Sequence, residues 1–277
     1  MDITTVTSFR SARSRADLAL APGEVVIAGG TWLMSEPQPR TTGFVDLTTL
    51  DWPDLEVTDE GLRIGATCTI ARLIDWAERE APPAWTSLAL VRPASDALLA
   101  SFKIWNTATV GGNVCQAFAA GAMIALLSTL DATALVWTPD GGERRIAVAD
   151  LVVDDAATSL APGEVVRALD VPAHALRARV GLQKIALAEL GRSGAVVTAR
   201  VDPDGAAVFV ITAAVRRPRV LRFARVPGAG ELRDAVASAT DFYTDPLGSA
   251  DWRRGVSVVL AERLRQGFAL DRREGAA

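Results

Sequence analysis

The sequence predicts an α+β protein: two small α/β subdomains followed by an α+β C-terminal domain with an antiparallel sheet and helices. Three observations lead to this prediction. In the first half of the chain, β-branched runs end in glycine, as at Val25-Val26-Ile27. In the second half, two apolar segments flank the turn Asp202-Pro203-Asp204-Gly205, and helical patterns close the chain. Antiparallel features therefore outweigh any regular alternation of strands and helices.

Length and composition are those of a globular protein with more than one core. The 277 residues allow two ordinary domains or three small subdomains that share a ligand. A hydrophobic fraction of 49% supplies the cores, and a net charge of −4 provides no basic field for nucleic acid. The longest apolar run, 117–127, is about half the length of a bilayer span, so we expect no transmembrane segment. The opening residues lack the basic leader of a secretory signal, and we expect a cytoplasmic protein.

We expect three parts, over residues 1–57, 58–172 and 173–277. The first has strand candidates at 25–27 and 44–47. The expected elements of the second part are a strand over 62–66, helices over 70–77, 89–102 and 123–130, and a hairpin over 134–148. Thr69 is the expected N-cap of the first of these helices.

The third part is expected to contain an antiparallel hairpin and two closing helices. Its hairpin strands are predicted over 195–201 and 207–211. The last helix follows Ser249. The residues expected to share one face of it are Trp252, Gly255, Val256, Val259, Leu260 and Leu264.

Two glycine pairs carry the functional signal. Gly29-Gly30 directly follows a predicted strand, and Gly111-Gly112 precedes a predicted buried helix. Neither pair has the spacing of a Rossmann or P-loop motif, and each alone is also compatible with a tight turn that needs positive φ. Adjacent glycines let backbone N–H groups converge into a concave nest for phosphate oxygens. One nest in each subdomain would grip the two phosphates of a dinucleotide lying between them.

Other side-chain chemistry is sparse. Cys68 and Cys115 are too few for an iron–sulfur cluster, and a zinc site would need more than the single histidine, His174. We expect His174 at the surface, Asp150, Asp154 and Asp155 in a solvated loop, no metal site and no catalytic residue. Any redox chemistry must therefore use an imported cofactor.

The glycine motifs, in their order and spacing, resemble those of a known family. Ala28-Gly29-Gly30-Thr31 and Thr109-Val110-Gly111-Gly112-Asn113 look like the two FAD-binding motifs of the FAD (medium) subunits of molybdenum hydroxylases, such as carbon monoxide dehydrogenase and xanthine dehydrogenase. These proteins have the FAD-binding fold of vanillyl-alcohol oxidase and p-cresol methylhydroxylase. Segments 160–165 and 245–254 also resemble the family, so the similarity covers nearly the whole chain.

The resemblance implies a cofactor and a set of contacts. FAD would bind in an extended form between the two FAD-binding subdomains, with its pyrophosphate on the glycine loops. Leu160 would touch the adenine or ribityl region, and Lys184 would lie near the flavin; a solvated surface cation is the other interpretation of Lys184. The implied cofactor-binding residues are Ile27, Ala28, Gly29, Gly30, Thr31, Trp32, Ala108, Thr109, Gly111, Gly112, Asn113, Leu160 and Lys184.

The resemblance also implies partners, in a dimer of heterotrimers. A large subunit would hold molybdopterin cytosine dinucleotide and oxidise the substrate, and an iron–sulfur small subunit would carry two 2Fe-2S clusters. The present chain would pass electrons to an external acceptor such as NAD, a quinone or oxygen. Two alternatives stay open: a stand-alone flavin oxidoreductase of the same superfamily, and a scaffold subunit that has lost FAD.

Three positions depart from the family pattern. Trp105 stands where relatives usually have arginine, and it would serve as core packing or as an adenine contact. Ala122 stands where many relatives have a carboxylate, and Leu182 where some stack a tyrosine on the flavin. The surroundings of the flavin ring are therefore the part that the resemblance defines least.

Overall fold

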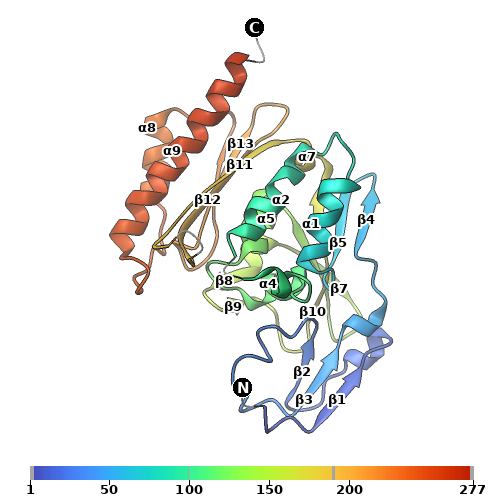
Figure 1. The fold of residues 1–277 in the computed structure, drawn as a ribbon. Helices are drawn as coiled ribbons and strands as arrows, with labels where there is room; N and C mark the ends of the chain where they lie inside the picture. The colour runs from blue at the N-terminus through green and yellow to red at the C-terminus, as the bar shows by residue number, and fades with distance from the viewer. Residues whose placement is uncertain (1–2, 99, 189–190, 275–277) are drawn as a thin grey trace.

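The computed structural model describes residues 3–98, 100–188 and 191–274. Three main sheets follow one another along the chain, and Figure 1 shows them as successive layers from the N-terminal end to the C-terminal helices. Most strand pairs are antiparallel and helices cover the sheets, so the predicted α+β class is confirmed.

The first sheet is a small parallel one. Its strands are β1 (Ser8–Ser11), β2 (Glu24–Ile27) and β3 (Gly43–Asp46), in the order β1-β3-β2. The 3-10 helices η1 (Arg15–Leu18) and η2 (Thr48–Leu50) follow β1 and β3. A minor core of Ala12, Leu18, Val45 and Leu47 holds this part together, and it is joined by Val165 from the second sheet.

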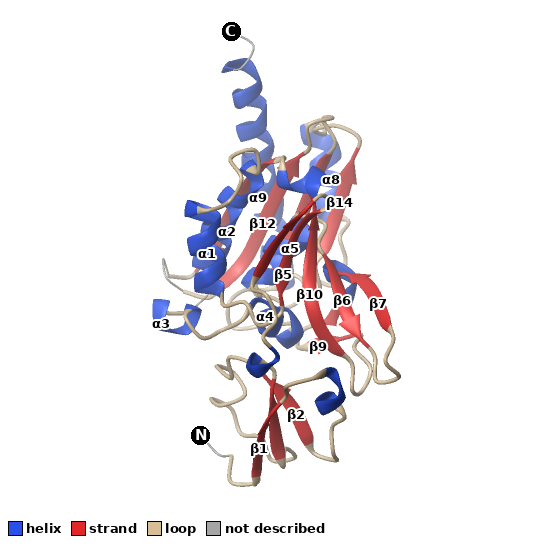
Figure 2. Ribbon diagram, turned by 90° about the vertical axis from the view of Figure 1, so that its right-hand side faces the viewer, coloured by secondary structure: helices blue, strands red, loops and turns tan. Residues whose placement is uncertain are grey.

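The second sheet is antiparallel and lies beside the first (Figure 2). In spatial order its strands are β4 (Leu55–Thr58), β5 (Gly61–Gly65), β10 (Val165–Pro172), β6 (Thr133–Trp137) and β7 (Glu143–Ala147). β6 and β7 form the predicted hairpin. A separate short ribbon is formed by β8 (Val152–Asp154) and β9 (Ala157–Thr158).

Helices pack around this second sheet. They are α1 (Ile70–Arg79), η3 (Thr86–Leu90), α2 (Val91–Asp96), α3 (Phe102–Trp105), α4 (Val110–Gln116), α5 (Ala122–Thr129), α6 (Val148–Leu151) and α7 (Ala173–Leu176). The Thr69 hydroxyl accepts a hydrogen bond from the Arg72 backbone N–H at 3.1 Å, so the predicted N-cap of α1 is confirmed. Every residue of α5 is buried, as its nearly continuous apolar sequence predicted.

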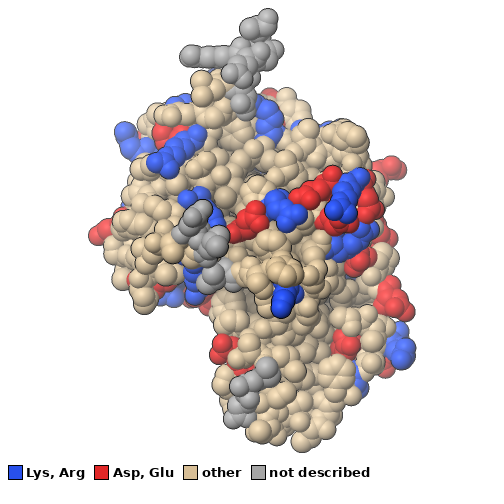
Figure 3. Space-filling view, in the orientation of Figure 1, with Lys and Arg blue, Asp and Glu red and all other residues tan. Residues whose placement is uncertain are grey.

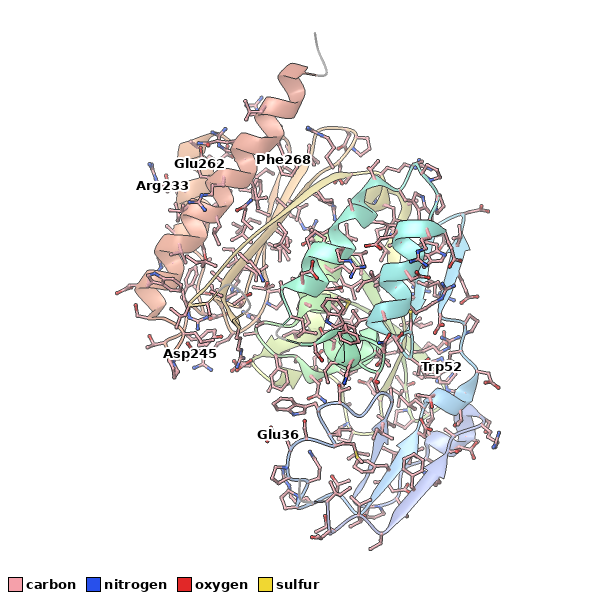
Figure 4. All side chains as sticks on the ribbon, viewed as in Figure 1. Glu36, Trp52, Arg233, Asp245, Glu262 and Phe268 are labelled. Atoms are coloured by element: carbon pink, nitrogen blue, oxygen red, sulfur yellow. The ribbon has the colours of Figure 1, made fainter. Side chains whose placement is uncertain are left out.

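The third sheet explains why α5 has no solvent face. It consists of β11 (Arg179–Ala186), β12 (Ser193–Val201), β13 (Ala207–Thr212) and β14 (Arg219–Phe223), paired antiparallel in chain order. α5 packs against β12 and β13, while α8 (Ala229–Ala237) and α9 (Ala250–Glu274) lie on the other side of the sheet (Figure 1). Both central strands are consequently buried along their whole length. Phe268 reaches from α9 toward this sheet (Figure 4).

The predicted helix over 89–102 is wrong in extent. α2 ends at Asp96, and after Leu99, which lies outside the described residues, α3 starts afresh at Phe102. Side chains of the third part bind the carbonyls at the break: the Lys184 ammonium donates to Asp96 O at 3.2 Å, and the Ser193 hydroxyl donates to Ala97 O at 3.4 Å. These carbonyls therefore do not accept from a further helical turn.

The predicted apolar face of α9 needs a correction. Gly255 and Val259 face solvent, and the Val259 side chain is 50% exposed. Over residues 250–270 of α9, where burial is described, the buried positions are Arg253, Ser257, Leu260, Ala261, Leu264 and Phe268. Arg253 is fully buried because its guanidinium donates to the carbonyls of Gly194 and Ala213 and pairs with Asp245. The buried face of α9 thus includes a charged residue, and a search for apolar periodicity does not find such a position.

Ion pairs also connect the second and third parts of the chain. Arg200 on β12 is 2% exposed, donates to Thr129 O at 2.7 Å and forms an ion pair with Asp131, which Arg222 also contacts. Burial acts to raise the pKa of Asp131, but hydrogen bonds from Arg222 and Arg200 outweigh it and hold that pKa below its ordinary value.

Charged side chains also gather on the outer face over α1 and α2 (Figure 3). Arg72 pairs with Glu80 at 2.5 Å and Arg92 with Glu78 at 2.8 Å, and each of these side chains is 38–48% exposed. Solvent screens exposed pairs of this kind, so they add little to stability. This face is a solvated surface, and no candidate binding residue lies on it.

Candidate functional site

A cavity of about 470 Å³ lies between the first part of the chain, α4 and the β11–β12 hairpin. Its wall is mostly apolar, with backbone amides and a few polar side chains, which is typical of a cofactor site. The lining residues are Val26, Ala28, Gly29, Gly30, Thr31, Trp32, Leu33, Ala97, Leu98, Ala100, Ile104, Ala108, Thr109, Gly112, Asn113, Cys115, Gln116, Phe118, Ala120, Gly121 and Arg192.

The first glycine pair makes a backbone-to-backbone contact between the first and second parts. A Cβ on Gly29 would lie 1.9 Å from the carbonyl oxygen of Thr107, which leaves no room for any side chain. Gly30 follows with φ +65°, a left-handed conformation that favours glycine. The pair thus lets the loop after β2 lie directly against the residues that precede α4.

The residues that follow Gly29 in the chain, Gly30, Thr31 and Trp32, line the cavity. Within the described part of the chain, the N–H groups of Gly30, Thr31 and Trp32 donate to no protein acceptor, although Gly30 O accepts from Met34 N at 2.8 Å. Three successive N–H groups without a protein partner are what a bound anion needs. These are the donors that the nest expected at the first glycine pair would use.

The second glycine pair differs from that expectation. It forms the first turn of α4, where Gly111 N donates to Ala66 O and Gly112 N to the Thr109 hydroxyl, both at 3.0 Å. Both amides are therefore used inside the protein, and no second nest of free N–H groups forms. Gly111 is needed for packing, since a Cβ there would lie 2.6 Å from that of Ala66.

Polar side chains are what the α4 segment offers the cavity. Asn113 accepts a hydrogen bond from Met123 N at 2.9 Å through its side-chain oxygen, which fixes the amide. Among the described residues, the Asn113 side-chain nitrogen has no partner. Thr109 also lines the cavity.

The structure brings together nine of the thirteen residues that the sequence implied. They are Ala28, Gly29, Gly30, Thr31, Trp32, Ala108, Thr109, Gly112 and Asn113.

The other four implied residues do not line the cavity. Ile27 is 7% exposed, and Gly111 packs on Ala66. Leu160 packs against the core of the second part. The Lys184 ammonium donates to Asp96 O, so Lys184 is tied to the end of α2.

Several lining residues outside the implied set had no signal in the sequence, among them Phe118, Ala97, Leu98 and Ala100. The Trp32 and Phe118 rings meet edge to face with centroids 4.6 Å apart and so connect the first and second parts. Ala97, Leu98 and Ala100 line the wall because the predicted helix breaks there. Periodicity gives no sign of such contacts, which depend on where distant segments meet.

Two residues singled out by the sequence are structural. Trp105 packs against the core of the second part, with the Arg92 guanidinium 5.9 Å from its ring centroid, and it is not among the lining residues. Cys115 does lie on the wall, but burial raises the pKa of its thiol to about 12, so the thiol stays neutral. His174 is at the surface, as expected, with its side chain 57% exposed.

The fold and this cavity define an α+β protein with a mostly apolar cavity between two of its parts. Residues 6–174 match the model of the FAD binding domain in molybdopterin dehydrogenase. That match spans more than half of the chain, so the chain belongs to this family, as the two glycine motifs predicted.

Solved structures show the same fold. A chain of quinoline 2-oxidoreductase from Pseudomonas putida 86 aligns with a TM-score of 0.77 and 21% identity over 94% of this chain and 97% of that one. A chain of the reconstituted CO dehydrogenase from Oligotropha carboxidovorans aligns with a TM-score of 0.79 and 20% identity over 94% and 96%. A chain of carbon monoxide dehydrogenase from Hydrogenophaga pseudoflava gives 0.78 and 17% over 94% and 96%.

Two further comparisons gave no positive result. None of the curated protein sequences compared with the chain matches it. Within the described residues, no helix combines the length and the apolar character that crossing a membrane requires.

Proposed function

We propose that this chain is the FAD-carrying electron-transfer subunit of a multi-subunit molybdenum hydroxylase. In this proposal it takes electrons from 2Fe-2S clusters of a partner subunit and passes them through FAD to an external acceptor. The observation that carries the proposal is the cavity wall, on which three successive backbone N–H groups without a protein acceptor follow the close Gly29–Thr107 contact.

The residues present fit such a cofactor. The N–H groups of Gly30, Thr31 and Trp32 would hold the pyrophosphate, because converging amides bind phosphate oxygens without a buried countercharge. Thr109 and Asn113 would add polar contacts from the opposite wall. Bound FAD would supply the redox chemistry, and the protein would position and tune it.

Partners complete the proposed assembly. A large subunit with molybdopterin cytosine dinucleotide would oxidise the substrate, and an iron–sulfur small subunit with two 2Fe-2S clusters would relay electrons, in a dimer of heterotrimers. We place this assembly in the cytoplasm, where the two free thiols of the chain would stay reduced. The acceptor would be NAD, a quinone or oxygen.

Two measurements test the proposal. The purified chain, incubated with FAD and then desalted, should keep a flavin absorbance spectrum at about one FAD per chain. Co-expression with the neighbouring genes should yield a complex that contains iron–sulfur and molybdenum subunits. A chain that retains no flavin would support the scaffold alternative. A lone chain that turns over a substrate would instead favour the stand-alone oxidoreductase.

A further inference from the structure

The cavity wall carries one charged side chain among its described residues. That residue is Arg192; the other lining residues are apolar, neutral polar or glycine. No carboxylate lies on the described wall to neutralise it. A bound group with a negative charge would therefore meet a single side-chain cation.

Arg192 has no competing partner within the described chain. No hydrogen bond or ion pair connects its guanidinium to residues 3–98, 100–188 or 191–274, and the residue is exposed. The buried arginines of the same domain differ, since Arg200 pairs with Asp131 and Arg253 with Asp245. The Arg192 guanidinium is therefore available to a ligand.

The position of Arg192 is nevertheless fixed at its backbone. It precedes Ser193, which pairs with Ala186 at the end of the β11–β12 hairpin. The Ser193 hydroxyl donates to Ala97 O at 3.4 Å, and Lys184 on the other strand donates to Asp96 O at 3.2 Å. Two hydrogen bonds thus hold the hairpin against the cavity rim.

Arg192 and the free amides reach the cavity from different elements. Ser193, next to Arg192, contacts Ala97, which clusters with the partly buried Ala120. The free amides follow Gly29, which lies against Thr107. A ligand that spans the cavity would meet the amides with one portion and the guanidinium with another.

Resting on the proposed function, we propose that Arg192 binds the N1–C2=O edge of the isoalloxazine and stabilises the negative charge of the reduced flavin. When FAD is bound, reduction by the proposed partner subunit would add two electrons, with one proton taken from solvent, and would leave one negative charge on that edge. A guanidinium stays charged at every working pH and presents several N–H donors in a plane, which suits this edge. Lys184, which the family resemblance placed near the flavin, is tied to Asp96 O and does not serve in this role.

The test compares two cations of one hairpin in the FAD-loaded protein. Equilibrium redox titration gives the two-electron midpoint potential of bound FAD in the wild type, Arg192→Gln, Arg192→Lys and Lys184→Gln. We expect R192Q to weaken the preference for the reduced flavin ten- to a hundredfold, which at 29.6 mV per tenfold lowers the potential by about 30–60 mV. R192K should recover part of this loss, and K184Q should match the wild type.

Calorimetric titration with FAD distinguishes the possible roles of Arg192. We expect the Kd of R192Q to stay within about threefold of the wild type, because the amides, not Arg192, hold the phosphates. An unchanged potential in R192Q, or a larger shift in K184Q, would overturn the inference. A tenfold loss of affinity at unchanged potential would overturn it as well and assign Arg192 to the phosphates. A wild-type chain that binds no FAD would refute the proposed function itself.

Discussion

At the scale of single residues, the site depends on positions where no side chain fits. Gly29 faces the Thr107 carbonyl at a distance that excludes a methyl group, and neither partner is a flexible side chain that can move away. The contact joins the first and second parts through their backbones. It also places the free N–H groups of Gly30, Thr31 and Trp32 on the cavity wall.

Gly29→Ala should separate these two backbones. We expect a loss of about 1–3 kcal/mol in the free energy of unfolding, the usual cost of overpacking, together with a large loss of FAD affinity. The matched control is Gly267→Ala in α9, where a Cβ meets nothing within 4 Å. That variant should gain about 0.5–1 kcal/mol in helix stability and bind FAD normally. Denaturant unfolding and calorimetry measure both quantities, and equal FAD affinity in the two variants would contradict this account.

Single residues also show what the sequence allows to be predicted. A glycine pair after a strand, followed by threonine, indicates a phosphate nest from local pattern alone, and nine of the implied residues line one cavity. The same pattern at Gly111 does not form a nest. The Gly111 N–H donates to Ala66 O and the Gly112 N–H to the Thr109 hydroxyl, so neither N–H group is available to a phosphate. Arg192 could not be predicted, since its position depends on how the third part docks.

At the scale of elements, two threonine-capped helices begin side by side. Thr69 caps α1 and Thr109 caps α4, and the two residues form a β-bridge with each other. Ile70 N donates to Ala108 O at 2.9 Å and Val110 N to Cys68 O at 2.8 Å, so each helix start is anchored to the segment before the other. Only the α4 cap lies on the cavity wall.

Substituting the two N-cap threonines one at a time should show whether a cap affects the free energy of unfolding, FAD affinity or both. Thr69→Ala and Thr109→Ala both lose a side-chain acceptor for a first-turn N–H, which costs about 1 kcal/mol. We expect similar losses in the free energy of unfolding. FAD affinity should fall in T109A alone, by severalfold, because Thr109 lines the cavity and Thr69 does not. An equal loss of affinity in T69A would mean that the joint between the helices, rather than the hydroxyl, controls binding.

The elements differ in how well the sequence predicts them. α1, α5 and the β6–β7 hairpin follow from local periodicity, caps and turns, and the structure has them where expected. The break within the predicted helix over 89–102 does not follow from local sequence. There, Lys184 and Ser193, almost a hundred residues away, donate hydrogen bonds to the backbone carbonyls. Local sequence cannot include contacts made from such a distance.

At the scale of the whole molecule, ion pairs connect the parts. Asp131 accepts from Arg200 on β12 and from Arg222 on β14, so one carboxylate links the end of α5 to the third sheet. Asp131 has φ +52°, a left-handed conformation that asparagine also tolerates. An asparagine there would remove the charge and leave the backbone unchanged.

Asp131→Asn should make the protein less sensitive to acid. The pKa of Asp131 is lowered in the fold, so its charge stabilises the folded state above the unfolded pKa of about 3.9 and ceases to do so as the pH falls through the folded pKa. We expect D131N to be less stable than wild type at pH 6 and the difference to shrink below about pH 4. Asp234→Asn, at a 76% exposed position, is the control and should change little at any pH. A pH-independent difference for D131N would refute the linkage.

FAD should stabilise the molecule as a whole, since the proposed site lies between two parts. At a hundred times its Kd, a ligand that binds only the folded state adds about 2.7 kcal/mol. For a chain of this size we expect Tm to rise by roughly 5–10 °C. Thermal unfolding at several FAD concentrations checks this, with FMN, which lacks the adenosine and one phosphate, as the comparison ligand. An equal shift with FMN would show that the dinucleotide is not needed.

The contact between Trp32 and Phe118 has a kinetic consequence. The two rings come from different parts of the chain, and both residues line the cavity. A planar ring system that enters between them must first separate them, so uptake of FAD would include a first-order opening step. The observed rate of binding in stopped-flow mixing would then level off at high FAD concentration, and replacing Trp32 with alanine would remove the plateau. The time needed to assemble the holoprotein would thus be set by an aromatic contact rather than by diffusion of the cofactor.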